Sequence, residues 1–370
     1  MKIVLLLAAL TPILVGEELD FNWKEHPELK FGKLVKVDFR YKLQSDFRGF
    51  GEGIVTDEGV HEFHRERIGI EGKLFKRVEF EIEREMRDPA DPWRDVYVNI
   101  RLNKALEIKG GKFKLPFSMD QLTSPTKSDF IYRSRAGQLL APGRDIGLMV
   151  HGRLFHRLLR YESGLFRQDG DNAQGGNLTV ASRVRTEWKH ALAGLSFTRS
   201  DLEEGENSLR GKTISGEKFF RRIYVNGTRL RLGAEGKWTA GPVTVKGEFI
   251  RVRDQRLGQG LTGADLPDLV ARGWYLTGVW RIGRFDVAAR HDALSFSSPG
   301  GVGRLARTPR AANVLGNRDS VWTFGGNWRV NRWFEVQSNL VHENLTDSLR
   351  TPIPGQAGFW AKLCRLQFVL

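Results

Sequence analysis

The sequence predicts an all-β protein, a transmembrane antiparallel up-and-down barrel of about sixteen strands. Polar and apolar residues alternate with a period of two along most of the 370-residue chain, and apolar stripes with helical spacing are nearly absent. Short and long connections alternate between these segments, which is typical of a barrel with tight turns at one rim and longer loops at the other. Trp and Tyr recur near segment ends, where the aromatic girdle of a membrane barrel lies.

The composition excludes several other classes of protein. Lys and Arg number 58 against 44 Asp and Glu, which gives a formal net charge of +14. The 10 Trp and 23 Phe argue against disorder, and Cys364, the only cysteine, excludes a disulfide scaffold. After residue 16, no stretch approaches the ~20 apolar residues that a membrane-spanning helix requires.

The N-terminus has the features of a secretory signal. Lys2 precedes an apolar stretch at residues 3–14, which ends at residues 15–17. We therefore expect a signal peptide at residues 1–16, an N-terminal leader segment at 17–28 and the barrel at 29–370; the alternatives for the first segment are a buried strand or a short anchor helix. Export without paired cysteines indicates a bacterial envelope protein.

The strands of the barrel are expected in chain order. The first eight are predicted near residues 31–44, 62–74, 77–87, 93–102, 105–115, 145–154, 157–167 and 178–188. The second eight are predicted near residues 191–200, 225–238, 242–253, 271–282, 284–294, 319–330, 333–344 and 359–370. The longer connections are expected at 45–61, 116–144, 168–177, 201–224, 254–270, 295–318 and 345–358, with 88–92 as a short exception.

The two faces of each segment differ in polarity. In one segment Trp274, Leu276 and Trp280 share a face, with Tyr275 and Arg281 on the opposite one. A soluble sandwich also alternates, but its core cannot hold such densely charged faces without pairing, whereas a water-filled lumen accepts them. Sixteen strands leave an open aqueous channel. We therefore expect the apolar faces to contact lipid and the charged faces to line water.

The expected lumen carries an excess of cations over anions. Its basic residues are Lys36, Arg40, Lys42, Arg65, Arg67, Arg101, Arg183, Arg185, Arg229, Arg231, Arg281, Arg290 and Arg329. Its acidic residues are Asp38, Glu79, Glu81, Asp95, Glu187 and Asp286. Rings of Arg and Lys favour anions, and a guanidinium fits phosphate oxygens bidentately. Any single Arg could instead pair with a carboxylate on the next strand, so the prediction of anion passage rests on the summed excess.

The connection at 116–144 is the expected constriction of this channel. It is nearly thirty residues long and contains Phe130, Ile131, Leu139 and Leu140, which favours a folded element over a flexible loop. Folding into the lumen would narrow the pore and bring Lys127, Asp129, Arg133, Arg135 and Arg144 into it. The alternative is an extracellular flap.

Four stretches in order resemble the phosphate-selective porins O and P. These stretches are residues 63–72 (FHRERIGIEG), 111–117 (GKFKLPF) with 123–125, 141–147 (APGRDIG) and 273–276 (GWYL). The resemblance extends from about residue 29 to the end. One departure is the last residue, Leu370, where the family usually has Phe; Phe368 lies two positions before it.

The resemblance implies a sixteen-stranded trimeric porin of the bacterial outer membrane that takes up small anions of the phosphate type. It implies arginines at the narrowest point and lysines that draw the anion there. Arg65 matches one of a pair of arginines, with His64 in place of its partner, and Asp95 matches an acidic residue of the constriction. From the residues and the resemblance together, the expected pore-lining and constriction set is Arg40, Arg65, Arg67, Asp95, Lys112, Lys114, Arg133, Arg135, Arg144, Arg210, Arg221, Arg222, Arg229 and Arg231.

Other functions find weaker support in the residues. The stretch from Gly205 to Thr213 ends like a phosphate loop, but Glu206 stands where the loop requires glycine. His61 and His64 lack the spacing of a zinc protease, so neither a metal nor another cofactor is expected. The alternative function is a barrel-scaffold outer-membrane hydrolase, a protease or phospholipase, with its site at the loop rim. No nucleic acid partner is expected, because the longest basic run is the pair Arg221–Arg222.

Overall fold

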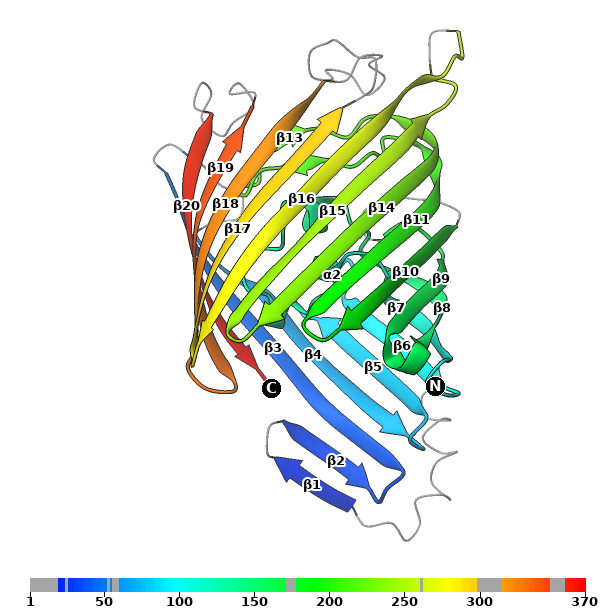
Figure 1. Ribbon diagram of the computed structural model, residues 1–370, viewed down its shortest axis with the longest axis vertical. Coiled ribbons are helices and arrows are strands. Elements are labelled where there is room, and N and C mark those ends of the chain that lie inside the picture. The colour runs from blue at the N-terminus through cyan, green and yellow to red at the C-terminus, as the bar shows by residue number, and fades with distance from the viewer. Residues whose placement is uncertain are drawn as a thin grey trace.

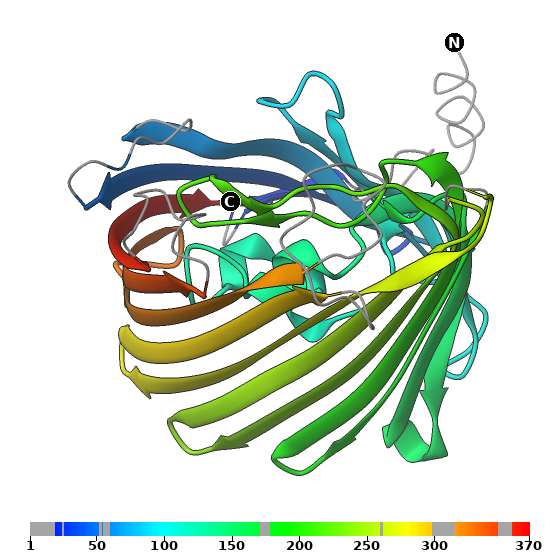
Figure 2. The same cartoon turned by 90° about the horizontal axis from the view of Figure 1, so that it is seen from above.

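Sixteen antiparallel strands close into one barrel in the computed structural model (Figures 1 and 2), which confirms the predicted fold class. The structure describes residues 19–23, 26–51, 54, 60–170, 178–259, 262–297, 315–346 and 357–370. The expected signal peptide at 1–16 lies outside the described residues. The barrel closes where β20 pairs with β3, for example at Phe368 and Leu43.

The sixteen barrel strands lie where the alternation predicts them. The first eight are β3 (Val35–Phe50), β4 (His61–Leu74), β5 (Val78–Glu85), β6 (Trp93–Arg101), β7 (Glu107–Lys114), β8 (Arg144–Leu154), β9 (Leu159–Phe166) and β10 (Thr179–Trp188). The second eight are β11 (Ala191–Gly205), β14 (Val225–Ala240), β15 (Val243–Arg256), β16 (Leu266–Ile282), β17 (Phe285–Ser297), β18 (Leu315–Arg329), β19 (Phe334–Leu345) and β20 (Gly358–Val369). Strands β14 to β16 are longer than the alternation alone indicates, because pairing continues beyond the apolar stretch.

Two further hairpins are not part of the barrel wall. Strands β1 (Leu19–Trp23) and β2 (Pro27–Phe31) pair with each other, and β2 pairs with the first residues of β3. Figure 1 shows this hairpin beside the turn rim of the barrel. The segment expected as a leader thus contributes β1 and the start of β2. The second hairpin, β12 (Gly211–Lys212) with β13 (Lys218–Phe220), belongs to the connection from β11 to β14.

The tight turns and the long connections lie at opposite rims (Figure 1). The connection from β16 to β17 consists of residues 283–284, and that from β14 to β15 of residues 241–242. Gly283 (φ 61°) and Gly241 (φ 54°) both adopt the left-handed conformation that two-residue hairpin turns require and that glycine adopts without a steric penalty.

The two faces of the strands differ in exposure as the sequence predicts. On β16, Trp274, Leu276 and Trp280 are 40%, 55% and 54% exposed on the outside, whereas Tyr275 and Thr277 on the inside are 3% and 1% exposed. The apolar residues therefore form the outer surface. Within the described part of the chain, the helices are too short or too polar to cross a membrane.

Candidate pore constriction

The connection from β7 to β8 folds into the lumen, as predicted. It contains the short helices α2 (Met119–Leu122), η2 (Pro125–Lys127) and α3 (Arg135–Leu139). Figure 2 shows these helices inside the ring of strands, so they narrow the passage. We call residues 115–143 the inner loop.

One end of the inner loop is attached to β15 through a carboxylate. Glu248 accepts hydrogen bonds from Ser118 Oγ (2.8 Å), from the backbone N–H of Asp120 (3.2 Å) and from that of Met119. The first backbone N–H groups of a helix have no partner within the helix, so a carboxylate there satisfies donors that would otherwise be buried and unpaired. Alternation on β15 predicts that Glu248 faces inward, but only the fold shows what it binds.

The middle of the inner loop is attached to the opposite wall through side-chain amides. Asn327 Nδ2 donates to the carbonyl of Asp129 (2.9 Å), and Gln337 Nε2 donates to that of Ser128 (2.9 Å). Asn339 Oδ1 accepts from the backbone N–H of Ile131 (2.8 Å). Three neutral side chains on two strands, β18 and β19, thus hold the loop, and the loop is fixed on both sides of the lumen.

Inward-facing glycines make room for the inner loop. A Cβ on Gly273 would lie 2.9 Å from Ala136 Cβ and 3.1 Å from Leu140 Cδ1, both in α3 or next to it. A Cβ on Gly325 would lie 3.0 Å from the Phe130 ring. Glycine inside a strand commonly marks such a close approach. The loop therefore packs directly on the backbone of the wall.

Two cations of the constriction are held by backbone carbonyls. Lys114 Nζ donates to the carbonyls of Gln121 (2.7 Å) and Thr123 (3.3 Å). Arg133 donates to the carbonyls of Thr123 (2.7 Å) and Asp120. Neither cation forms an ion pair in the described part of the chain, so no described carboxylate neutralises either of them.

Arg65 is a third cation of this kind. A bulge in β4 pairs Gln44 with Arg65 and Ser45 with Phe63, which leaves His64 as the extra residue. Arg65 donates to the amide oxygen of Gln44 and forms no ion pair with a described residue. It lies within electrostatic range of Arg67 and Arg133, and Lys114 lies within range of Arg133 and Arg144. Positive charge is therefore concentrated at the inner loop.

Arg133 stays protonated although other cations lie nearby. Burial, together with the nearby Arg144 and Arg67, lowers the pKa of Arg133, while Asp120 acts in the opposite direction. A guanidinium starts from a pKa so high that it stays protonated at neutral pH.

Other expected site residues are paired with carboxylates. Arg67 binds Glu83 and Glu85 at 2.8 Å each, and Arg144 binds Asp95 at 2.6 Å. Arg40 pairs with Glu71, and Lys112 pairs with Asp91 at 2.5 Å, away from the two cavities described below. Asp95 thus neutralises Arg144, next to the end of the inner loop.

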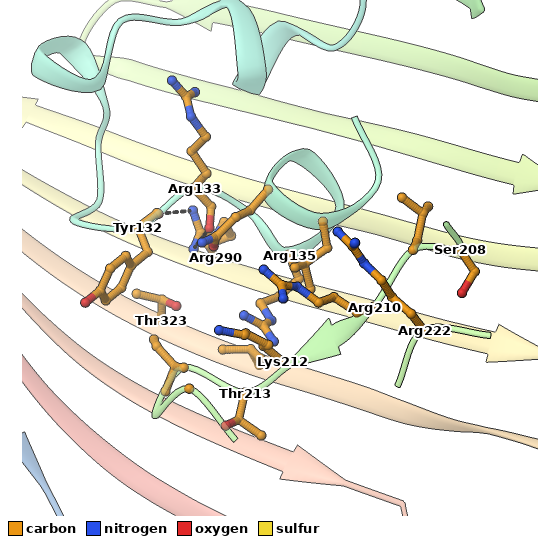
Figure 3. A pocket seen from close by; sticks show the side chains of 16 residues that line it. Tyr132, Arg133, Arg135, Ser208, Arg210, Lys212, Thr213, Arg222, Arg290 and Thr323 are labelled. Atoms are coloured by element: carbon orange, nitrogen blue, oxygen red, sulfur yellow. Dashed lines mark hydrogen bonds between the residues drawn. The ribbon is translucent and has the colours of Figure 1, made fainter. Parts of the chain in front are cut away.

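Two polar cavities flank the inner loop. The cavity on the loop side, of about 290 Å³, is lined by residues that include Arg133, Arg135, Arg210, Lys212, Arg222 and Arg290. Figure 3 shows these basic side chains gathered between α3 and the β12–β13 hairpin. The cavity on the turn side, of about 370 Å³, is lined by both charges, including Lys42, Arg67, Lys109, Lys114, Arg144, Arg160, Arg183 and Arg185 with Glu81, Glu83, Asp95 and Glu162. The inner loop thus lies between two charged cavities.

The loop-side cavity contains further cations without carboxylate partners. In the part of the chain that the structure describes, Arg210, Lys212 and Arg222 form no ion pair. Burial and the nearby Arg210 and Arg229 lower the pKa of Arg222, which is evidence of uncompensated charge. Arg290 has a different role: it binds Asp292 (2.7 Å) and donates to the carbonyl of Arg133 (3.2 Å), and so positions the inner loop.

Two arginines expected in the lumen, Arg229 and Arg231, are buried in ion pairs. Arg229 binds Asp254 (2.6 Å) and Asp169 (2.7 Å), and Arg231 binds Asp169. Both arginines are 0% exposed, so the expectation that they line water differs from the structure. The physical reason is that the inner loop and the connection with the β12–β13 hairpin cover the inward-facing positions of β14 where these two arginines lie.

Arg135 and Arg221 complete the expected set. Arg135, in α3, binds Asp319 at 2.8 Å and Glu343 at 3.4 Å, so it attaches the helix to the wall although it borders the loop-side cavity. Arg221 is exposed and does not line that cavity. The cavity instead contains Lys212, which the sequence presents only as part of an incomplete phosphate-loop motif. No periodic signal marks such a residue, because its position depends on how a long connection folds.

Two groups of potential metal ligands are already neutralised by cations. They consist of His26, Glu28 and Asp38 in one group and Asp46, Glu62 and His64 in the other. Lys36 lies 2.5 Å from Glu28 and 3.2 Å from Asp38, and Arg365 lies 2.6 Å from Asp46. The carboxylates therefore have partners within the chain.

Comparisons with known proteins agree with this architecture. The family model of the phosphate-selective porins O and P matches residues 35–352. Among solved structures, the anion-selective porin from Comamonas acidovorans is similar (TM-score 0.62, 11% identity, 91% of this chain and 100% of that chain). So are OmpT of Vibrio cholerae (0.63, 11%, 92% and 99%) and the outer membrane channel DcaP of Acinetobacter baumannii (0.61, 9%, 91% and 97%). No curated protein matches this sequence.

Proposed function

The chain belongs to the phosphate-selective porin O and P family, whose members are porins of the bacterial outer membrane, and on this premise we propose that it conducts small anions by passive diffusion. Phosphate-type anions are the proposed substrate class. We further propose that the protein acts as a homotrimer and that it is a channel and not an enzyme.

The observation that carries this proposal is the way the constriction holds its cations. Lys114 and Arg133 are fixed by carbonyls and Arg65 by a side-chain amide. A carbonyl orients a cation without cancelling its charge, whereas a carboxylate cancels it. In a narrow passage with low-dielectric walls, uncompensated charge concentrates counter-ions by roughly tenfold or more. An anion would therefore be enriched at the inner loop and a cation depleted.

The loop-side cavity supports phosphate-type anions as the substrate class. Arg210, Lys212 and Arg222 offer guanidinium and ammonium donors that no described carboxylate occupies. Arginine binds phosphate oxygens through two parallel N–H groups, and lysine adds a point charge. An anion that enters from the loop side would meet these donors before the constriction.

The experiment is ion selectivity in a planar bilayer. In a KCl gradient, we expect a reversal potential whose sign shows that chloride is more permeant than potassium. We expect the double variant Lys114→Gln/Arg133→Gln to lower the chloride-to-potassium permeability ratio by on the order of tenfold. We also expect phosphate to reduce the chloride current, and less so in the double variant. Lys189→Gln/Arg332→Gln, which removes two charges at the turn rim, is the matched control. Cation preference of the unmodified protein would refute the proposal.

A further inference from the structure

A group of arginines lies on the outside of the barrel, toward the rim of the long loops. We name Arg199 (β11), Arg251 and Arg253 (β15), Arg272 (β16) and Arg318 (β18) the outer arginine patch. All five residues are exposed. On β15 and β16 they alternate with buried residues such as Val252 and Ala271, so they occupy the same face as the apolar outer surface. They cannot contribute to the lumen, which the wall separates from them.

Strand register brings these arginines together. Arg251 lies directly opposite Arg272 across β15 and β16. Arg272 lies opposite Ser295 on β17, and Ser295 lies opposite Arg318 on β18, so Arg318 belongs to the same row. Arg253 and Arg199 both lie opposite Leu230 in the neighbouring row. Like charges directly opposite one another destabilise a sheet. An anion bound from outside the protein would therefore stabilise this arrangement.

The chain supplies only part of the required negative charge. Arg253 pairs with Asp268 on β16, and Asp201 shares the outer face of β11 with Arg199. Arg199, Arg251 and Arg272 form no ion pair within the described residues. Among the described residues, Arg199, Arg251 and Arg272 thus lack a carboxylate partner, and this part of the patch carries an excess of positive charge.

The patch lies at the height of lipid headgroups. A strand tilted by about 40° climbs ~2.5 Å per residue along the membrane normal. Arg272 is ten residues from Ile282, and Arg251 is eight residues from Val243, at the turn rim. The arginines therefore lie ~20–25 Å above the turn rim, which matches the ~25 Å apolar band of an outer-membrane barrel. Arginine at the middle of this band would be costly, whereas at its edge it meets phosphates.

A shallow apolar groove lies below the patch. Small outward residues, Gly278, Ala289, Gly326 and Ser338, form its floor on β16 to β19, and Trp280 and Phe324 are among the larger side chains that line it. The groove begins six residues, or ~15 Å, below Arg272 on β16. The length of a lipid acyl chain is comparable to this ~15 Å distance, and the chain is apolar throughout, so it can reach the groove from a headgroup at the patch.

We propose that the outer arginine patch binds the phosphate groups of a phosphorylated lipid in the outer leaflet, with an acyl chain of the lipid in the groove below. The guanidinium groups provide bidentate donors for phosphate oxygens, and their spacing in two adjacent rows fits a headgroup with more than one phosphate. The lipid phosphates supply the negative charge that the Arg251–Arg272 juxtaposition lacks.

The test measures binding of lipopolysaccharide to the purified, detergent-solubilised protein by native mass spectrometry and by titration. Each basic side chain near an anionic lipid surface contributes about fivefold in affinity, so we expect Arg251→Gln/Arg272→Gln to bind roughly 30-fold more weakly. Arg284→Gln/Arg332→Gln, at the turn rim, is the matched control and keeps full affinity. Channel conductance of the double variant should be unchanged, which shows that the barrel is folded.

Two further arms separate lipid from other partners. Dephosphorylated lipopolysaccharide should bind about as weakly to the unmodified protein as the intact lipid binds to the double variant, and inorganic phosphate should not compete at equal concentration. Equal binding of the dephosphorylated lipid, or full affinity in the double variant, would overturn the proposal. A change of oligomeric state in the double variant, with unchanged lipid binding, would show that the patch contacts another copy of the chain instead.

Discussion

The partner of each charged side chain decides its role in this barrel. Arg65, Lys114 and Arg133 are bound by neutral oxygens, and no described carboxylate neutralises them beside the inner loop. Arg229 and Arg231 are bound by carboxylates and are completely buried. They attach the wall to the connection between β9 and β10, which contains Asp169. The same residue type therefore serves permeation in one place and stability in another.

Loss of the shared carboxylate tests the structural role. Asp169→Asn leaves Arg231 buried without a carboxylate, and breaking a buried pair in this way costs about 3–5 kcal/mol. We expect a lower unfolding temperature and a lower urea midpoint. Both are measured from the change in gel mobility as the folded barrel unfolds. Asp268→Asn, which breaks the exposed pair with Arg253, should cost less than about 1 kcal/mol. Equal effects of the two substitutions would contradict the assignment.

The pH dependence of this pair has a defined sign. Burial opposes ionisation of Asp169, but Arg231 and Arg229 outweigh it and lower the pKa of its carboxyl well below the usual range. A depressed pKa in the folded state gives stability that is fully present above the unfolded value of about 3.9 and is lost progressively as the pH falls from there through the folded value. The stability difference between the protein and Asp169→Asn should therefore be the same at pH 7 and pH 5 and shrink below about pH 4.

At the scale of the element, the inner loop is held by contacts on both sides of the lumen. Glu248 binds one end, Asn327 and Gln337 bind the middle, and α3 packs on the backbone at Gly273. A loop fixed in this way keeps Lys114 and Arg133 at a constant position. The size of the pore thus depends on packing that lies away from the permeating ion.

A side chain at Gly273 tests this packing. Gly273→Val places new atoms against Ala136 and Leu140, so we expect α3 to shift and the single-channel conductance to change. Gly278→Val is the matched control on the same strand, because a Cβ at Gly278 meets no atom within 4 Å. Conductance traces of the two variants and of the unmodified protein give the comparison. An unchanged conductance in Gly273→Val would show that α3 does not set the pore size.

At the scale of the whole molecule, positive charge is concentrated on two separate surfaces of a chain with a net charge of +14. Cations inside the barrel gather at the inner loop and the cavity on its loop side, and the outer arginine patch lies on the opposite side of the wall. The barrel therefore separates charges that act on permeating ions from charges that face the membrane.

Ionic strength tests whether long-range fields select the ion. The Debye length falls from about 10 Å at 0.1 M salt to about 3 Å at 1 M, so exposed charges of the cavities are screened first. We expect the chloride-to-potassium permeability ratio to fall as KCl rises from 0.1 M to 1 M, measured from reversal potentials at a fixed gradient. A ratio independent of salt would mean that selection occurs only by direct contact at the constriction.

The fold could be predicted to within a few residues per strand, and the candidate site only in part. Alternation predicted β16, and the length and composition of the β7–β8 connection predicted a folded element; Arg133, Lys114 and Asp95 line the cavities beside the inner loop. Lys212 gave no signal, because its place depends on a hairpin within a long connection. The burial of Arg229 and Arg231 gave none either, because other segments cover them.

Residue order and composition are enough to predict the strands, their inward and outward faces and the excess of positive charge, since a two-residue period and a composition are local properties of the chain. The pairing of each cation follows only from the folded barrel, because the partners come from distant segments: Arg365 binds Asp46 across a separation of 319 residues. Electrostatic interactions depend on distance in space, and no pattern along the chain encodes that distance.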